Sequence, residues 1–133
     1  MLKKTITYTD FNGVARTEDF YFNLSKAELM EMELGTHGGF AEMLHKIVDA
    51  NDAPTIMKTF KSFILKAYGE KSADGKRFIK SDEISNAFAQ TEAYSQIFME
   101  LITDAEAAAN FINGIIPAEL AQQASRQAIA PAN

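Results

Sequence analysis

Apolar residues recur at every second position in two stretches near the start of the chain, residues 3–8 and residues 19–24. In the first, Ile6 and Tyr8 alternate with threonines, and this period of two is typical of half-buried β-strands. Asn12-Gly13 lies between the stretches and supplies the positive φ angles that tight hairpin turns require. We therefore predict an antiparallel β-hairpin over about 3–24, whose exposed edge would suit a partner strand.

From Ser25 onward the apolar residues adopt helical spacing. Ser25 and Glu28 form a capping box, in which each side chain satisfies a free backbone amide of the first turn. Gly114, followed by Pro117, is predicted to end the last helix. Between these limits, over about 26–116, further helices are predicted to begin near Phe40, Pro54, Ser81, Thr91 and Thr103.

Residues 67–82, read as AYGEKSADGKRFIKSD, form a polar connector between two helical halves. Asp74-Gly75 is a strong turn signal, and Phe78 and Ile79 give the returning segment something to bury. The connector is interpreted as a short hairpin or an ordered loop.

These elements predict a mainly α fold with a small N-terminal β-hairpin (α+β), arranged as a compact multi-helix domain. One domain is expected over 1–117, because 133 residues suffice for a single core. Residues 118–133 are predicted to be a weakly ordered or helical tail, since they are rich in Ala and Gln. The predicted core consists of Phe60, Phe63, Ile64, Phe88, Tyr94, Phe98, Leu101 and Phe111.

The formal net charge of −5 hides an uneven distribution. Seven of the thirteen basic residues lie between positions 58 and 80, where only Glu70 and Asp74 are acidic, so this segment carries +5 and the remainder −10. Such a segment can steer an acidic partner, whereas the acidic whole does not favour nucleic-acid binding. The alternative is a solvated helix face.

Composition restricts the chemistry further. The chain has no cysteine and no run of eighteen apolar residues, so we predict a cytoplasmic protein without a membrane span. His37 and His45 are the only histidines, and an EF-hand aligned on Gly75 would place Ser81 where calcium needs a glutamate. No phosphate-binding or nucleophile motif occurs. We therefore expect no enzyme activity, no metal and no cofactor.

Two longer stretches resemble a known family: FKSFILKAYGEKSADGKRFIKSDEI, which begins at Phe60, and FAQTEAYSQIFMELITDAEAAANFINGIIP, which ends at Pro117. They are similar to tail assembly chaperones of long-tailed (siphophage-type) bacteriophages. The segments that carry the similarity are residues 66–72, Asp74-Gly75, 77–80, 88–94 and 111–117.

The resemblance implies a protein of the host cytoplasm that is absent from the mature virion. It would bind the tape measure protein and keep it soluble until tail tube subunits polymerise around it. The tail tube protein and a second copy of the chain are further candidate partners. The expected partner-binding residues come from the basic segment, and they are Lys58, Lys61, Lys66, Arg77, Phe78 and Lys80.

Two other interpretations stay open at this point. The chain could be a structural virion tail protein or tail-completion protein, whose strand pair adds to a neighbour's sheet in a ring. A weaker alternative is a small regulatory module that uses residues 58–80. Gene order would separate them, because a chaperone gene should lie between the major tail protein and tape measure genes.

Overall fold

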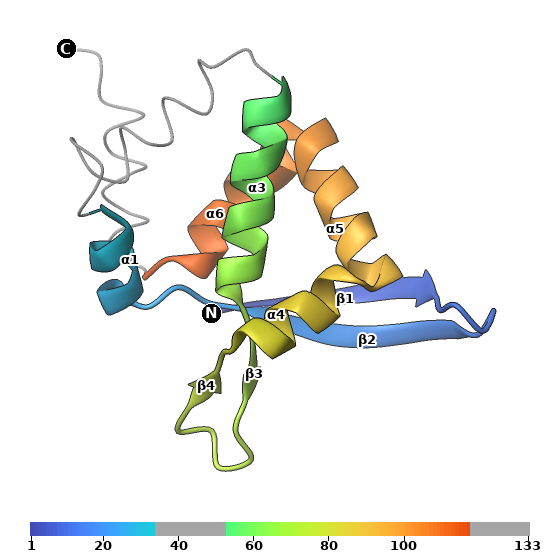
Figure 1. Cartoon of the computed structure of the whole chain (residues 1–133), viewed down its shortest axis with the longest axis horizontal. Helices are drawn as coiled ribbons and strands as arrows, with labels where there is room; N and C mark the ends of the chain where they lie inside the picture. The colour runs from blue at the N-terminus through green and yellow to red at the C-terminus, as the bar shows by residue number, and fades with distance from the viewer. Residues whose placement is uncertain (34–52, 118–133) are drawn as a thin grey trace.

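The computed structural model describes residues 1–33 and 53–117. Its four strands form one antiparallel sheet in the order β1-β2-β3-β4, and they are β1 (Leu2–Thr9), β2 (Ala15–Phe22), β3 (Tyr68–Lys71) and β4 (Phe78–Ile79). The described helices are α1 (Lys26–Glu33), α3 (Ala53–Ala67), α4 (Asp82–Ala89), α5 (Glu92–Thr103) and α6 (Ala105–Ile115). α3, α5 and α6 lie on one side of the β1–β2 hairpin, whereas α1 lies beyond its end (Figure 1).

The N-terminal hairpin forms as predicted. β1 and β2 pair over eight residues without a bulge, from Leu2 opposite Phe22 to Thr9 opposite Ala15. Gly13 has a φ of 80°, which is the left-handed conformation that the turn requires. The second strand begins at Ala15, earlier than the alternation indicated, because residues 15–18 pair with β1 while their side chains stay largely in solvent.

The predicted fold class is wrong in limiting the β-structure to an N-terminal hairpin. β3 pairs with β2, with Tyr21 opposite Gly69 and Phe22 opposite Tyr68. β4 pairs with β3 and extends the sheet further. The amide of Asn23 also donates to the carbonyl of Ala67 (2.8 Å), which continues the pairing to the end of α3. The fold is therefore α+β, with a four-stranded sheet assembled from two distant parts of the chain.

The connector contains a short hairpin, which was one of its two predicted forms. Its turn is held by the Ser72 hydroxyl, which donates to Asp74 Oδ1 (2.7 Å), and by the Lys76 amide, which donates to the same oxygen (3.0 Å). Gly75 has a φ of 73° and nothing within 4 Å of the place where a Cβ would stand. Backbone conformation alone therefore favours glycine here.

Replacing Gly75 with valine is expected to lower the free energy of unfolding by about 1 to 2 kcal/mol, because a left-handed φ forces the Cβ against the backbone. Gly75→Asn is the control, since asparagine tolerates this conformation, and its cost should be clearly smaller. Chemical denaturation of both variants measures the difference. Equal losses would show that the φ angle does not limit the substitution.

Most predicted helix starts are correct. The Ser25 amide donates to Glu28 Oε1 (2.8 Å) while the Glu28 amide donates to Ser25 Oγ (3.1 Å), and Ser81 and Thr91 cap α4 and α5. The start of α6 is shifted by one residue, because Asp104 is the cap and the Thr103 hydroxyl donates to the carbonyl of Met99 (2.6 Å). The helix predicted from Phe40 lies outside the described residues, as does the tail.

The core lies between the sheet and the helices. Six of the eight predicted core residues are buried, whereas Tyr94 and Phe98 are only partly buried against that core. Gly114 lies inside α6, which ends one residue later at Ile115. A Cβ at this position would stand 2.9 Å from Leu2 Cδ1, so the close packing of β1 favours glycine here. Large buried side chains outside this list of eight are Phe22, Leu24, Leu29, Ile97, Ile112 and Ile115.

Candidate functional site

A row of lysines runs along the solvent-facing side of α3. Lys58, Lys61 and Lys66 are separated by three and five residues, and with Ser62 and Leu65 they occupy positions i, i+3, i+4, i+7 and i+8 of one helical face. The side chains of Phe60, Phe63, Ile64 and Ala67 point the other way and are buried. The basic and apolar faces of α3 are thus separated by the helical period alone.

This lysine face forms one wall of an open groove of about 760 Å³. The opposite wall comes from the segment that leads into α4 and from its first turns. The Ser85 hydroxyl donates to the carbonyl of Leu65 (3.1 Å), which ties the two walls together. We call this surface the lysine groove, and its lining residues are Lys58, Lys61, Ser62, Leu65, Lys66, Lys80, Ser81, Asp82, Ser85 and Asn86.

The lysine groove carries an excess of positive charge. Among the residues that the structure describes, Lys58, Lys61 and Lys66 have no ion-pair partner and are exposed. Asp82 is the single acidic residue in the lining, and it lies in the first turn of α4, where the helix dipole favours a negative charge. The three ammonium groups are therefore available to carboxylates of a partner.

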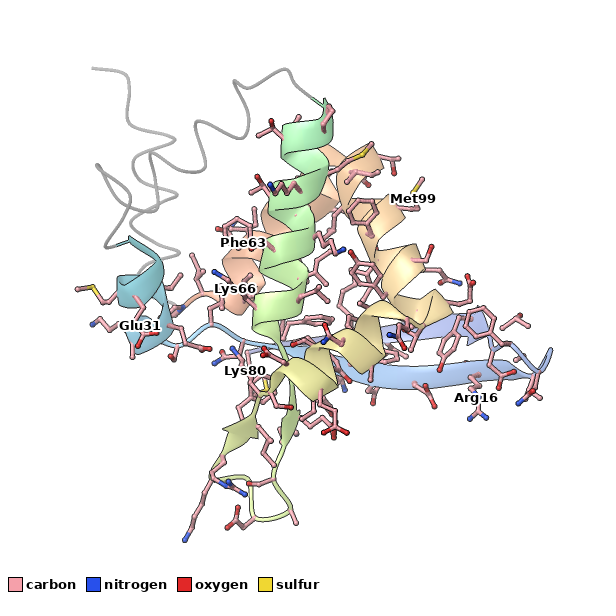
Figure 2. All side chains as sticks on the ribbon, viewed as in Figure 1. Arg16, Glu31, Phe63, Lys66, Lys80 and Met99 are labelled. Carbon is pink, nitrogen blue, oxygen red and sulfur yellow. The ribbon has the colours of Figure 1, made fainter. Side chains whose placement is uncertain are left out.

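Lys80 also lines the groove, but its ammonium group is used within the fold. It donates to Glu28 Oε2 (2.6 Å) and to the carbonyl of Asn23 (2.7 Å), at the start of α1. Burial alone would raise the pKa of the Glu28 carboxyl, but the hydrogen bonds from Lys80 and from the Ser25 amide outweigh this effect and hold the pKa below its ordinary value. Figure 2 shows Lys66 and Lys80 at the same end of α3.

Arg77 and Phe78, the other two predicted site residues, lie on the β3–β4 hairpin and do not line the groove. The Arg77 backbone closes the turn by accepting from the Ser72 amide (2.9 Å), while its side chain is exposed. Phe78 is half-buried over Gly69 and has the Lys80 ammonium 5.7 Å from its ring centroid. The structure therefore gathers four of the six predicted residues and separates these two.

The described residues offer little for other chemistry. They contain no group of three or more acidic, histidine or cysteine side chains placed to hold a metal ion. Within residues 1–33 and 53–117, no helix is long and apolar enough to cross a lipid bilayer. His37 and His45 lie outside the described ranges.

The family model for phage tail assembly chaperones matches residues 1–133, the whole chain. The chain belongs to this family. No curated protein and no solved structure matches it. The resemblance first seen in residues 60–117 is thereby confirmed and extended over the N-terminal part.

This tail assembly chaperone also has surface features that the sequence analysis missed. The polar wall of the lysine groove, Ser81, Ser85 and Asn86, could not be assigned without knowing how α4 lies against α3. Phe11 is 77% exposed at the tip of the β1–β2 hairpin, and its position beside Asn12-Gly13 was the available signal. Met99 projects from α5 into solvent (Figure 2) and is 51% exposed.

Proposed function

We propose that this chaperone binds the tape measure protein in the host cytoplasm and keeps it soluble until tail tube subunits polymerise around it. Membership of the family supports a role in tail assembly. The observation that supports binding of the tape measure protein is the lysine groove, a positively charged surface on a chain whose net charge is −5. A chaperone family also favours a role in binding over catalysis.

The lysine groove fits a helix that carries acidic residues. Lys58 and Lys66 are eight residues apart on α3, so they span about 12 Å, which equals slightly more than two turns of a partner helix. Carboxylates at intervals of three or four residues on that helix would face the lysines in turn. Leu65 adds an apolar contact in the same lining.

Charge reversal in the groove tests this proposal. The variant Lys61→Glu/Lys66→Glu is expected to weaken association with the tape measure protein about tenfold at low salt and less at high salt, because screening reduces the contribution of exposed charges. Lys71→Glu/Lys76→Glu makes the same change of charge on the β3–β4 hairpin and should have a much smaller effect. Co-purification of the coexpressed proteins, titrated with salt, measures both variants.

Two results would contradict the proposal. The first is equal weakening by both variants, which would assign the effect to net charge. The second is an unchanged amount of soluble tape measure protein when the chaperone is omitted. Mass spectrometry of purified virions is expected to find no stoichiometric amount of the chain, because the proposed role ends when the tail is complete.

The second candidate function, a structural virion tail or tail-completion protein, is favoured by one observation. β1 is the outermost strand of the sheet, and no described strand pairs with its outer side. A ring of subunits joined by strand addition could use that edge, with the tail tube protein as a neighbour. Stoichiometric recovery of the chain from virions would support this function over the chaperone proposal.

A further inference from the structure

The outer edge of β1 is open to the addition of another strand. No described strand pairs with it, and its eight residues keep an unbroken register with β2, without proline or bulge. Short strands, prolines and bulges are the common devices that prevent unwanted pairing, and β4, at the other edge of the sheet, has only two residues. One edge of the sheet is therefore protected by its shortness, and the other is not.

The hydrogen-bond pattern of the hairpin shows which groups β1 presents at this edge. The Asp10 amide donates to the carbonyl of Val14 (2.9 Å), so the residues of β1 that bond to β2 are the even-numbered ones. The N–H and C=O groups of the odd-numbered residues therefore point away from β2, and these residues are Lys3, Thr5, Thr7 and Thr9. An extended backbone can satisfy such a row of groups, whereas a helix cannot, because its own backbone groups are already bonded.

Two hollows lie beside this edge, between β1 and the helices α5 and α6, with volumes of about 440 Å³ and 590 Å³. The ion pair between Lys4 and Glu100 (2.9 Å) lines both of them. A lysine that points inward on an edge strand usually opposes strand addition, but here Glu100 neutralises its charge. The hollows thus leave room for side chains of an added strand.

The smaller hollow is acidic. It is lined by Asp104 and Glu106, which have no ion-pair partner among the described residues. Lys3 lines it as well, but its side chain belongs to the exposed set on the other face of the sheet. We call this space the acidic hollow, and its charge suits a lysine or arginine side chain.

The larger hollow is more apolar. It is lined by Ile6, Ile97 and Met99, besides the polar side chains of Gln96 and Thr103. Met99 is 51% exposed, and its flexible thioether can adapt to an apolar side chain placed beside it. We call this space the apolar hollow.

We infer that the outer edge of β1 binds an extended segment of another protein, in which an apolar residue precedes a lysine or arginine by four positions. The segment adds antiparallel to β1, as the other strands of the sheet pair, and alternate side chains point toward α5 and α6. Leu2 lines only the acidic hollow, and Ile6, four residues later, lines only the apolar hollow. The apolar side chain opposite Ile6 therefore enters the apolar hollow, and the cation opposite Leu2 enters the acidic one.

The first test adds the synthetic peptide STVTTTKTS to the full chain and measures hydrogen exchange of backbone amides by NMR. At saturating peptide, the outward-pointing amides of Lys3, Thr5 and Thr7 should exchange at least about fivefold more slowly. The amides of Lys4 and Ile6 should change little, because they already face β2. No slowing at a peptide concentration of about 1 mM would overturn the inference.

The second test uses variants of the peptide, and fluorescence anisotropy measures their affinities. STKTTTVTS has the same composition in the opposite order, and STVPTTKTS lacks one N–H that would face the carbonyl of Thr5. Each should bind at least about fivefold more weakly than STVTTTKTS. Equal binding of the two orders would contradict the assignment of the hollows.

The third test reverses the charge of the acidic hollow. Glu106→Lys should weaken binding of STVTTTKTS about threefold to fivefold at low salt and strengthen binding of STVTTTETS, in which glutamate replaces the lysine. Glu92→Lys is the matched control, because Glu92 also lies in the first turn of a helix but lines neither hollow. Thermal unfolding shows whether both variants fold.

Three further results would overturn the inference. Equal weakening by Glu106→Lys and Glu92→Lys would assign the effect to net charge. Slowed exchange without slowing at the outward-pointing amides would place the peptide elsewhere. Concentration-dependent slowing at these amides without peptide would assign the edge to a second copy of the chain. Lys61→Glu/Lys66→Glu should leave peptide binding unchanged, so the outcome is independent of the function proposed for the lysine groove.

Discussion

Replacing Phe22 with alanine is expected to lower the free energy of unfolding by about 3 to 5 kcal/mol, the largest single effect that we predict. The Phe22 side chain has no exposed surface. Its ring centroid lies 5.7 Å from that of Tyr68, 5.9 Å from that of Phe88 and 5.3 Å from that of Phe111. These contacts join β2 to β3, α4 and α6, so the cavity would lie where four elements meet.

Chemical denaturation of Phe22→Ala measures this loss, and Phe11→Ala is the matched control. Phe11 is 77% exposed, so the same substitution there should change the free energy of unfolding by less than about 0.5 kcal/mol. Phe63→Ala, at a buried site in α3, should lower the free energy of unfolding by about as much as Phe22→Ala. Phe98→Ala, at a half-buried site, should cause a loss between those of Phe11→Ala and Phe22→Ala. Similar losses for Phe11 and Phe22 would contradict the described core.

The second large effect is expected for Gly69→Ala, which should destabilise the fold by about 1 to 3 kcal/mol by overpacking. A Cβ at this position would stand 2.7 Å from Phe78 Cε2 and 2.9 Å from the carbonyl oxygen of Ile79. The second contact is to backbone, so relieving it requires β4 to move away from β3. The absence of a side chain at Gly69 is thus what allows the β3–β4 pairing.

A double-mutant cycle separates the two contacts. If the Phe78 ring accounts for part of the cost, Gly69→Ala should be less destabilising in a Phe78→Ala background than in the wild type. The remaining cost then reports the contact with Ile79. An unchanged or stabilised Gly69→Ala protein, measured by thermal and chemical denaturation, would show that β3 and β4 are not held as closely as described.

The local elements of this fold could be predicted because short sequence signals determine them. Ser25, Ser81 and Thr91 satisfy free amides at helix starts, and that role depends on residues only three positions away. The hairpin turn at Gly13 is likewise set by its own φ angle. The predicted start of α6 at Thr103 was one residue too early, because the Asp104 carboxylate caps the helix by accepting from the amides of Glu106 and Ala107.

The assembly of the sheet could not be predicted because its signals lie far apart in the chain. β3 has four residues and β4 has two, too few to show an alternating pattern. Their place beside β2 depends on the packing of Tyr68 against Phe22 and Phe88, in which Tyr68 stacks on Phe88 with ring centroids 4.0 Å apart. No local propensity encodes a contact of this kind.

The candidate site could be predicted only where it depends on local sequence signals. The spacing of Lys58, Lys61 and Lys66 follows the helical period, so their common face could be inferred from sequence. The second wall of the lysine groove depends on the position of α4, and the engagement of Lys80 depends on Glu28, which lies 52 residues earlier. The prediction grouped Arg77 with these lysines on the basis of charge alone, but Arg77 lies on the β3–β4 hairpin and the lysines line the groove.

The amide of Leu24 donates to the carbonyl of Ile115 (2.7 Å), a hydrogen bond that joins the end of the N-terminal hairpin to the last helix. Phe22 makes its closest ring contact with Phe111 in the same helix. β1 and β2 are synthesised before α6, so their apolar face cannot be fully covered until α6 has also been synthesised. Such long sequence separation makes folding late and cooperative, so a nascent chain that stops before α6 would expose this face to aggregation.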